Sequence, residues 1–308
     1  MIHTRDLAKR YGAHAALDGV DLHVPAGSIY GLAGPNGAGK TTLLDIVAGL
    51  RAPTSGEVAI DAAPGTIAVL PDTPQFDPWL TGREVVALAQ SLTAPAGDDA
   101  RVDEVLDQTG LADAAARRCG GYSRGMLQRL GLAATLVSRP SLILLDEPAS
   151  ALDPQGRREV LDLISQLRGQ ATILFSSHIL GDVQEVCDAV GVLHHGRLLF
   201  QGPLSELLVG RAVPRYLVRV REGAATGVGT GVGTGAGTTA HDVAAALSRE
   251  PWVASAAAGD AGQVTIEVAS MADAEHRLPA ALAATGASVV SLGPEAVSLE
   301  RAFLELTS

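Results

Sequence analysis

The sequence has few cysteines, few basic residues and no long apolar run. Its two cysteines, Cys119 and Cys187, form no CxxC pair, which excludes a disulfide framework and a cysteine-rich zinc site and suits a reducing cytosol. The uncharged stretches 223–240 and 278–294 are too rich in Gly, Thr, Pro, Ala and Ser to form membrane-spanning helices. With 23 Lys and Arg against 34 Asp and Glu, and a net charge of −11, the chain is unsuited to coating nucleic acid.

Lysine and asparagine are almost missing. Lysine occurs only at Lys9 and Lys40, against 21 arginines, and asparagine occurs only at Asn36. A bias of this kind usually reflects genomic base composition. A lysine and an asparagine that lie four positions apart in such a chain therefore mark a place where the side chain matters.

The first two thirds of the chain alternate short apolar runs with helical patterns. This alternation predicts an α/β fold with a mainly parallel sheet flanked by helices. The expected strands are Ser28–Leu32, Thr66–Leu70, Leu142–Asp146, Thr172–Ser176 and Ala189–Leu193. The expected helices are Lys40–Ala48, Gly82–Leu92, Arg124–Val137, Pro154–Leu167 and Ile179–Val186.

Residues 212–308 predict a small α+β accessory domain. We expect the Gly/Thr-rich tract 223–239 to be a loop inside it, although a linker between domains has the same composition. The expected elements are a strand at 215–220, a helix at 242–247, strands at 264–268 and 287–292, and helices at 272–282 and 299–306. The last helix is apolar at positions 299, 303 and 306, which predicts that it packs on this domain. From residue 240 onward three Arg stand against nine Asp and Glu, so we expect no nucleic-acid-binding tail.

A glycine-rich motif follows the first expected strand of the parallel sheet. It fits GxxxxGK[ST] in full and consists of Gly34, Pro35, Asn36, Gly37, Ala38, Gly39, Lys40 and Thr41. Backbone N–H groups in such a loop point at phosphate, the lysine reaches the β- and γ-phosphates, and the threonine hydroxyl ligates Mg²⁺. A simple Gly-rich turn before a helix is the alternative, and the preceding strand and the rare Lys and Asn argue against it.

A second apolar strand, Leu142–Asp146, ends in two acidic residues. Its tip brings Asp146 to a Mg²⁺ ion, and Glu147 is placed to orient and deprotonate water. Asp-Glu-Pro also suits the start of a helix, but the phosphate motif upstream favours the metal interpretation.

The segment Tyr122–Arg129 resembles the signature motif of the ATP-binding subunits of ABC transporters. Ser123 and Gly125 match the common form Leu-Ser-Gly-Gly-Gln, whereas Tyr, Arg and Met fill the other positions. This variant, like the terminal segment 298–307, is similar to the exporter branch that contains antibiotic self-resistance and multidrug-efflux ATPases. An ordinary capped helix start would also explain Ser123.

The resemblance implies a P-loop ATPase domain at 1–211, with a helical subdomain at about 74–140, followed by the accessory domain. It implies ATP and Mg²⁺ as ligands, with Tyr11 stacking on adenine and the loop 34–41 and Thr42 holding the phosphates. In trans, Ser123 and Gly125 of the signature segment, which also contains Arg124 and Met126, would contact the γ-phosphate held by the opposite subunit. Asp153 resembles the D-loop aspartate and His178 the switch histidine, although an edge strand or a cap would also accommodate a Tyr or a His.

One position departs from the family pattern. The family's Q-loop glutamine should fall near Val69–Pro71, where Asp72 stands, and Gln75 follows three residues later. We assign the role to Asp72, as a further ligand of Mg²⁺ or of the attacking water, and hold Gln75 in reserve.

The resemblance therefore implies an ATP-hydrolysing subunit that dimerises head to tail around two ATP molecules. It would lie at the cytoplasmic face of the membrane and power a separate permease, exporting a hydrophobic or drug-like compound, with no nucleic acid as partner. The alternatives are a soluble ABC-type ATPase of translation or DNA repair and an ATP-binding regulator that does not hydrolyse ATP. The lack of heptads between Lys40 and Asp146 argues against the first, and the presence of Glu147 and His178 argues against the second.

Overall fold

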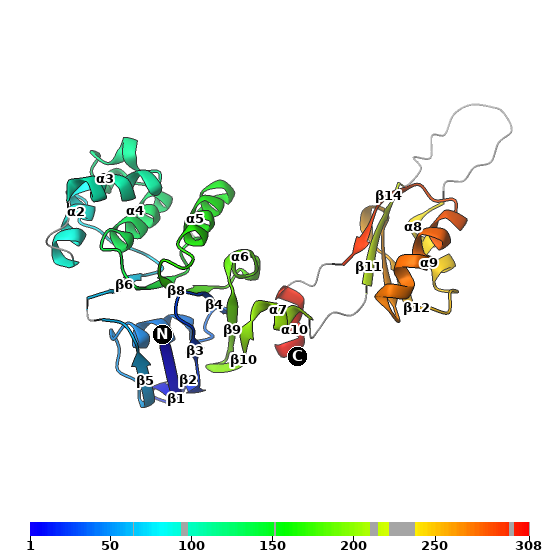
Figure 1. The fold of residues 1–308 in the computed structure, drawn as a ribbon, viewed down its shortest axis with the longest axis horizontal. Coiled ribbons are helices and arrows are strands. Elements are labelled where there is room, and N and C mark those ends of the chain that lie inside the picture. The colour runs from blue at the N-terminus through cyan, green and yellow to red at the C-terminus, as the bar shows by residue number, and fades with distance from the viewer. Residues whose placement is uncertain are drawn as a thin grey trace. The chain divides into compact units, whose positions relative to one another are not determined.

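The computed structural model describes residues 1–63, 65–93, 98–150, 152–209, 215–221, 238–295 and 299–307 (Figure 1). The chain divides into two compact units, one formed by 1–208 and 298–308 and the other by 209–297. Most of the Gly/Thr-rich tract, residues 222–237, and Ala151 of the expected D-loop lie outside the described residues. In the described part of the chain, every helix is too short or too polar to cross a membrane.

The first unit is built around a six-stranded sheet in the order β10-β9-β4-β8-β7-β6. Five of these strands run parallel, and β10 pairs antiparallel with β9. The strands are β4 (Ile29–Ala33), β6 (Ile67–Leu70), β7 (Leu142–Asp146), β8 (Thr172–Ser177), β9 (Ala189–His194) and β10 (Arg197–Pro203). All five strands that the sequence predicts here are confirmed, with ends that differ by a residue or less.

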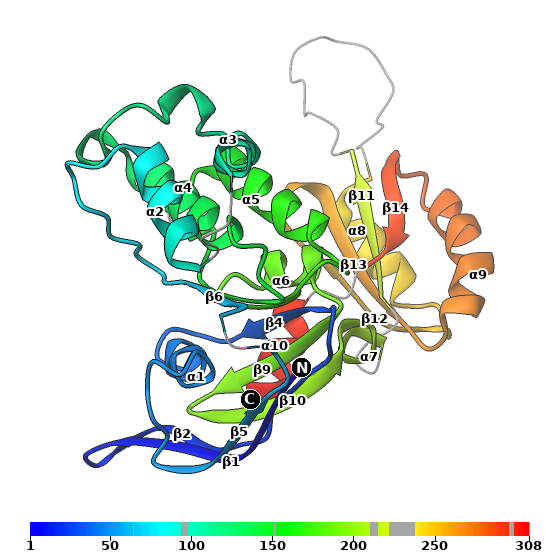
Figure 2. The ribbon, with the colours of Figure 1, turned by 60° about the vertical axis from the view of Figure 1, so that its left-hand side comes forward.

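The sheet is apolar on both faces because it separates two cores. Along β7, Ile143 and Leu145 face one core, while Leu142 and Leu144 face the other. Helix α1 (Lys40–Val47) and the N-terminal strands cover the second face, and α5 (Pro154–Gln166) and α6 (Leu180–Val186) cover the first (Figure 2). Burial on both faces explains why these strands appear in the sequence as continuous apolar runs.

A second, antiparallel sheet belongs to the N-terminal region and was not predicted. It contains β1 (Ile2–Tyr11), β2 (His14–Val20), β3 (His23–Val24) and β5 (Ser55–Ile60), with β1 pairing to the other three. Only Ile2, Thr4 and Leu7 of β1 are buried. Apart from Ala8, the other positions carry charged or polar residues, so no apolar run marks the strand.

In the described part of residues 74–140, where the resemblance implies a helical subdomain, three α-helices are present. They are α2 (Gly82–Thr93), α3 (Asp99–Gln108) and α4 (Arg124–Leu136), and they pack on one another (Figure 1). The sequence predicted α2 and α4 but missed α3, which is highly charged and buries only Val102, Val105 and Leu106. Short 3₁₀ turns at Ala112–Ala114 and Cys119–Gly121 join α3 to α4, and the short helix α7 (Leu204–Val209) follows β10.

The second unit is an α+β sandwich of the split β-α-β kind. Its antiparallel sheet has the order β12-β13-β11-β14. The elements are β11 (Arg215–Val220), α8 (Ala240–Leu247), β12 (Val253–Ala258), the 3₁₀ turn Asp260–Gly262, β13 (Gln263–Val268), α9 (Met271–Ala284) and β14 (Val289–Pro294). Trp252 and alternate residues of β11 and β13, such as Val218 and Ile266, form its core with the two helices. Strand β12 was not predicted.

The last helix, α10 (Leu299–Thr307), corrects one prediction. The sequence predicted that it packs on the accessory domain, and that prediction is wrong. Leu299 and Ala302 are fully buried in the core of the first unit, and α10 packs on α6. Apolar spacing identified the helix but carried no information on which core receives its apolar face.

Candidate functional site: a phosphate-binding loop and its carboxylates

The glycine-rich loop connects β4 to the first residue of α1. Gly39, just before the helix, has φ +106°, a conformation that side chains disfavour. A Cβ atom there would lie 2.4 Å from the carbonyl oxygen of Ala16, and one at Gly34 would lie 2.3 Å from that of Leu193. Glycine is therefore required at both positions, because the loop lies directly on the backbone of β2 and β9.

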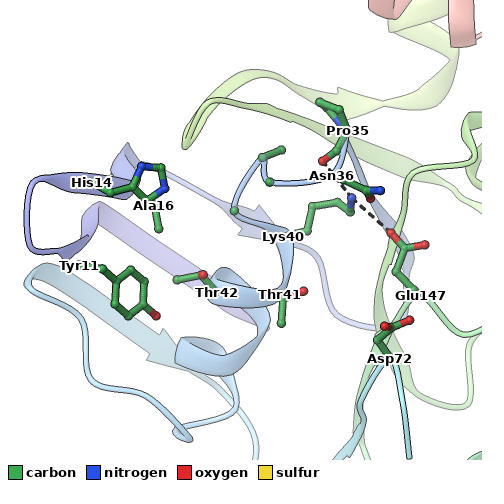
Figure 3. A pocket seen from close by; sticks show the side chains of 13 residues that line it. Tyr11, His14, Ala16, Pro35, Asn36, Lys40, Thr41, Thr42, Asp72 and Glu147 are labelled. Carbon is green, nitrogen blue, oxygen red and sulfur yellow. Dashed lines mark hydrogen bonds and ion pairs between the residues drawn. The ribbon is translucent and has the colours of Figure 1, made fainter.

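Lys40 is the first residue of α1 and is only 6% exposed. Its Nζ donates to the carbonyl oxygens of Gly34, at 2.7 Å, and Pro35, at 3.3 Å, and forms an ion pair with Glu147 Oε1 at 3.3 Å (Figure 3). The ammonium group thus lies between the loop and the end of β7, within reach of an anion bound to the loop.

The two acidic residues after β7 differ in their surroundings. Asp146 is 5% exposed and accepts a hydrogen bond of 2.5 Å from Ser176 Oγ. Burial raises the pKa of the Asp146 carboxyl, and the negative charges of Glu147 and Asp72 act in the same direction. Hydrogen bonds from Ser176 and Thr41 oppose this rise in the pKa. The loop threonine and the strand-end carboxylate are therefore in contact, as expected of two ligands of one ion.

Glu147 has an unusual backbone conformation, with φ +50°. A non-glycine residue in this region is strained, and such residues cluster at functional sites. Its N–H donates to Ser176 Oγ at 3.0 Å, and its Oε2 lies 2.8 Å from His178 Nδ1. One carboxylate therefore contacts both the loop lysine and the histidine after β8.

Asp72 follows the carboxyl end of β6, which is parallel to β7, so it lies at the same edge of the sheet as Asp146 and Glu147. Its Oδ1 accepts a hydrogen bond of 3.2 Å from Ser150 Oγ. Asp72 lines the same cavity as Lys40 and Glu147, whereas Gln75 lines a different, mainly apolar pocket with residues of β6 and α4.

These groups surround a cavity of about 350 Å³ (Figure 3). Its lining contains every residue of 35–42, together with Tyr11, His14, Ala16, Asp72 and Glu147. Tyr11 is 43% exposed, and the Lys9 ammonium and the Arg51 guanidinium lie 5.4 and 5.5 Å from its ring centre. An exposed aromatic ring at one end and a phosphate loop at the other suit a nucleotide.

His14 is a lining residue that the sequence did not reveal. It pairs with Tyr11 across the β1–β2 hairpin, so the two side chains share one face of the sheet. The sequence signal that could have revealed His14 is the two-residue turn at Gly12–Ala13, where Gly12 has φ +60°, because such a turn pairs the residues on either side of it.

The signature segment and the D-loop aspartate lie apart from this cavity. Ser123 caps α4, accepting from Met126 N–H at 3.2 Å, and Asp153 caps α5, accepting from Gly156 N–H at 3.0 Å. Ser123 and Arg124 are exposed, and none of residues 123–126 belongs to the described lining of the cavity. A Cβ atom at Gly125 would lie 3.1 Å from the Leu152 side chain, so the signature helix and the D-loop segment are neighbours.

Comparisons with known proteins agree with this geometry. The family model described as ABC transporter matches residues 17–150. The uncharacterized ABC transporter ATP-binding protein YxlF of Bacillus subtilis (strain 168) is 40% identical over 72% of this chain and 77% of its own length. The bacitracin transport ATP-binding protein BcrA of Bacillus licheniformis is 38% identical, over 67% of this chain and 71% of its own. A solved dimeric ATP-binding cassette, in a post-hydrolysis state with ADP and Pi, has a TM-score of 0.61 and 25% identity, covering 66% of this chain and 99% of that one.

The fold, the phosphate loop beside two strand-end carboxylates, and these likenesses lead to one assignment. The chain belongs to the ABC transporter family, as one of its ATP-binding, ATP-hydrolysing subunits.

Proposed function

We propose that two copies of this chain close around two ATP molecules and drive a separate membrane permease that exports a hydrophobic or drug-like compound. ATP-binding subunits of this family work as dimers with a membrane permease. The observation that carries the proposal is the separation of Ser123 from the cavity of Lys40 and Glu147 within one chain. A second copy, placed head to tail, supplies Ser123 to the γ-phosphate and completes the site.

Within this site each residue has a defined task. Lys40 and the loop N–H groups bind the β- and γ-phosphates, and the Tyr11 ring stacks on adenine. Glu147 takes a proton from a water molecule. The oxygen of this water attacks the γ-phosphorus, and the bond between that phosphorus and the bridging oxygen of ADP breaks. His178 holds the Glu147 carboxylate in position through its 2.8 Å contact.

The residues near Asp146 fit a Mg²⁺ ion. Thr41, Asp146 and Asp72 offer hard oxygen ligands, and Thr41 already contacts Asp146. In the described part of the chain, no group of three or more His, Cys, Asp or Glu could hold a metal by itself. That suits Mg²⁺, which takes one or two protein carboxylates and completes its shell with phosphate and water. When bound, the ion neutralises charge on the phosphates.

The export direction and the cargo class rest on likeness to relatives. The signature variant is that of the exporter branch, and BcrA is by its name a bacitracin transport protein. The chain would act at the cytoplasmic face of the membrane, where its permease binds it.

The enzymatic part is tested by the ATPase rate of Glu147→Gln. Loss of the base should reduce kcat by about 100-fold or more, with ATP affinity retained. Glu57→Gln, an exposed position on β5, is the matched control and should behave as wild type. Equal rates for Glu147→Gln and wild type would refute the role of Glu147.

The transport part is tested by affinity purification from native membranes. We expect the chain to co-purify with a polytopic membrane protein. Recovery with ribosomes or DNA, and without such a protein, would overturn the transport proposal while leaving the ATPase assignment intact.

A further inference from the structure

Helix α10 belongs to the ATPase unit although residues 209–297 separate it from the rest of that unit in the sequence. Leu299 and Ala302 are completely buried in the same core as β7 and β8. Phe303 and Leu306 pack against this core as well. The helix therefore contributes to the interior on which the nucleotide site is built.

One contact of α10 is with the helix that follows His178. Helix α6 begins two residues after this histidine, and Gln184 lies in its middle. The side-chain oxygen of Gln184 accepts a hydrogen bond of 2.7 Å from the N–H of Leu299, the first residue of α10. The first N–H groups of a helix have no partner within it, so this bond ties the start of α10 to α6.

Helix α6 is also held from its other side. Asp182 is 3% exposed and pairs with Arg157 of α5, whose Nε donates to it at 2.6 Å. Helix α6 is therefore bound to α5 through the Arg157–Asp182 ion pair and to α10 through the hydrogen bond of Gln184.

A second contact of α10 is with the turn beneath the phosphate loop. The Phe303 ring lies edge-on to the His194 ring, with centroids 6.3 Å apart. His194 ends β9, and two residues later the N–H of Gly196 donates to the carbonyl oxygen of Ala38 at 3.0 Å. Gly34, at the start of the phosphate loop, packs against the carbonyl oxygen of Leu193, the residue before His194. This turn supports the loop at both of its ends.

We propose that α10 is a positioning element of the nucleotide site. Gln184 fixes the helix that presents His178, and Phe303 fixes the turn that supports the phosphate loop. The inference rests on the roles proposed above for Lys40 and His178. It assigns two positioning residues that lie outside the cavity and act on different steps: Phe303 on ATP binding and Gln184 on hydrolysis.

The two contacts predict different kinetic signatures. Phe303→Ala should raise the Kd and KM for MgATP about threefold to tenfold, the range for one aromatic pair, with kcat little changed. Gln184→Ala should lower kcat about threefold and leave the Kd for MgATP unchanged. Hydrogen exchange should increase in peptides covering 34–42 and 189–197 for the first variant, and in those covering 178–186 for the second.

Conservative variants and a control separate positioning from general weakening. Phe303→Tyr keeps the ring, and Gln184→Glu keeps an acceptor oxygen at the start of a helix, so both should restore wild-type kinetics. Leu304→Ala removes a leucine of α10 that is 63% exposed and should change none of these readouts.

The proposal is overturned if Phe303→Ala and Gln184→Ala match Leu304→Ala in Kd, kcat and exchange. A uniform loss in both parameters, accompanied by a lower Tm, would also overturn it, since that is the signature of a structural role alone. If Phe303→Ala folds poorly, Phe303→Leu, which keeps apolar volume without the ring, takes its place. A wild-type chain that binds but does not hydrolyse ATP would refute the proposed function, and the Kd and exchange readouts would still decide this inference.

Discussion

At the scale of single residues, one buried serine connects the two acidic residues that follow one another at the end of β7. Ser176 is fully buried in β8; its Oγ donates to Asp146 and accepts from the N–H of Glu147. It thereby contacts the carboxylate of Asp146 and the strained backbone of Glu147 at the same time. Ser176 lies two residues before His178, but no sequence pattern showed that it contacts both acidic residues.

Replacing Ser176 by Ala should therefore impair catalysis. The buried Asp146 loses a donor and the Glu147 N–H loses its acceptor, each worth about 1–3 kcal/mol when left unmet. We expect kcat to fall by about tenfold or more and the Mg²⁺ concentration for half-maximal rate to rise, as measured by steady-state ATPase assays. Ser141→Ala, a hydroxyl removal at the opposite end of β7, is the control, and an equal effect there would contradict the prediction.

Asp72 and Gln75 give a second test at this scale. Asp72 lines the cavity and is held by Ser150, whereas Gln75 lines another pocket. Asp72→Asn should lower kcat several-fold, because a neutral amide is a poorer partner for Mg²⁺ or water. Gln75→Ala should leave kcat within about twofold of wild type. The reverse result would transfer the Q-loop role to Gln75.

At the scale of elements, sequence patterns identified every parallel strand of the main sheet and missed the N-terminal antiparallel strands and helix α3. The strand β7 is a continuous apolar run because Leu142 and Ile143 face different cores. The antiparallel strand β1 and the charged helix α3 bury only three side chains each, and their polar positions hide the pattern. The phosphate loop was predictable because chemistry fixes its residue types. His14 and Gln184 were not, because their roles depend on partners distant in sequence or across a turn.

The start of α8 offers a test at the element scale. Thr239 accepts from Asp242 N–H, and the Asp242 carboxylate accepts from Thr239 N–H and Oγ1, forming a capping box. Thr239→Ala should destabilise the second unit by about 1 kcal/mol in denaturant unfolding. These hydrogen bonds hold the pKa of Asp242 below its usual value.

The lowered pKa of Asp242 also sets a pH dependence. A carboxyl whose pKa is lowered by folding stabilises the folded state above its unfolded pKa, near 3.9, and loses this effect as the pH falls through the folded pKa. The stability difference between wild type and Asp242→Asn should therefore be present at pH 7 and shrink below about pH 4. Ser248→Ala, at the other end of the helix, should show no such pH dependence. A difference that stays constant down to acidic pH would contradict the assignment.

At the scale of the whole molecule, the chain leaves the ATPase unit after Leu208 and returns to it at Ser298. The second unit is therefore an insertion before the last helix. The predicted division into 1–211 and 212–308 assigns α10 to the accessory domain and so separates this helix from the ATPase unit to which it belongs. Two chains shortened in different ways test this organisation. A chain that ends at Glu295 lacks α10, whereas a chain in which about 15 Gly and Ser residues replace 209–297 keeps it.

The first chain should be less stable and the second should not. Loss of α10 uncovers the core surface that Leu299, Ala302 and part of Phe303 bury, and burial of one leucine alone contributes about 1.5–3 kcal/mol. The chain that ends at Glu295 should therefore unfold at lower urea concentration in the ATPase unit, followed through ATP binding, and should bind an apolar dye. The bridged chain should match the ATPase unit of the full-length protein in both measurements. If the bridged chain loses as much stability as the chain that ends at Glu295, residues 209–297 also stabilise the ATPase core, and the prediction for the bridged chain is wrong.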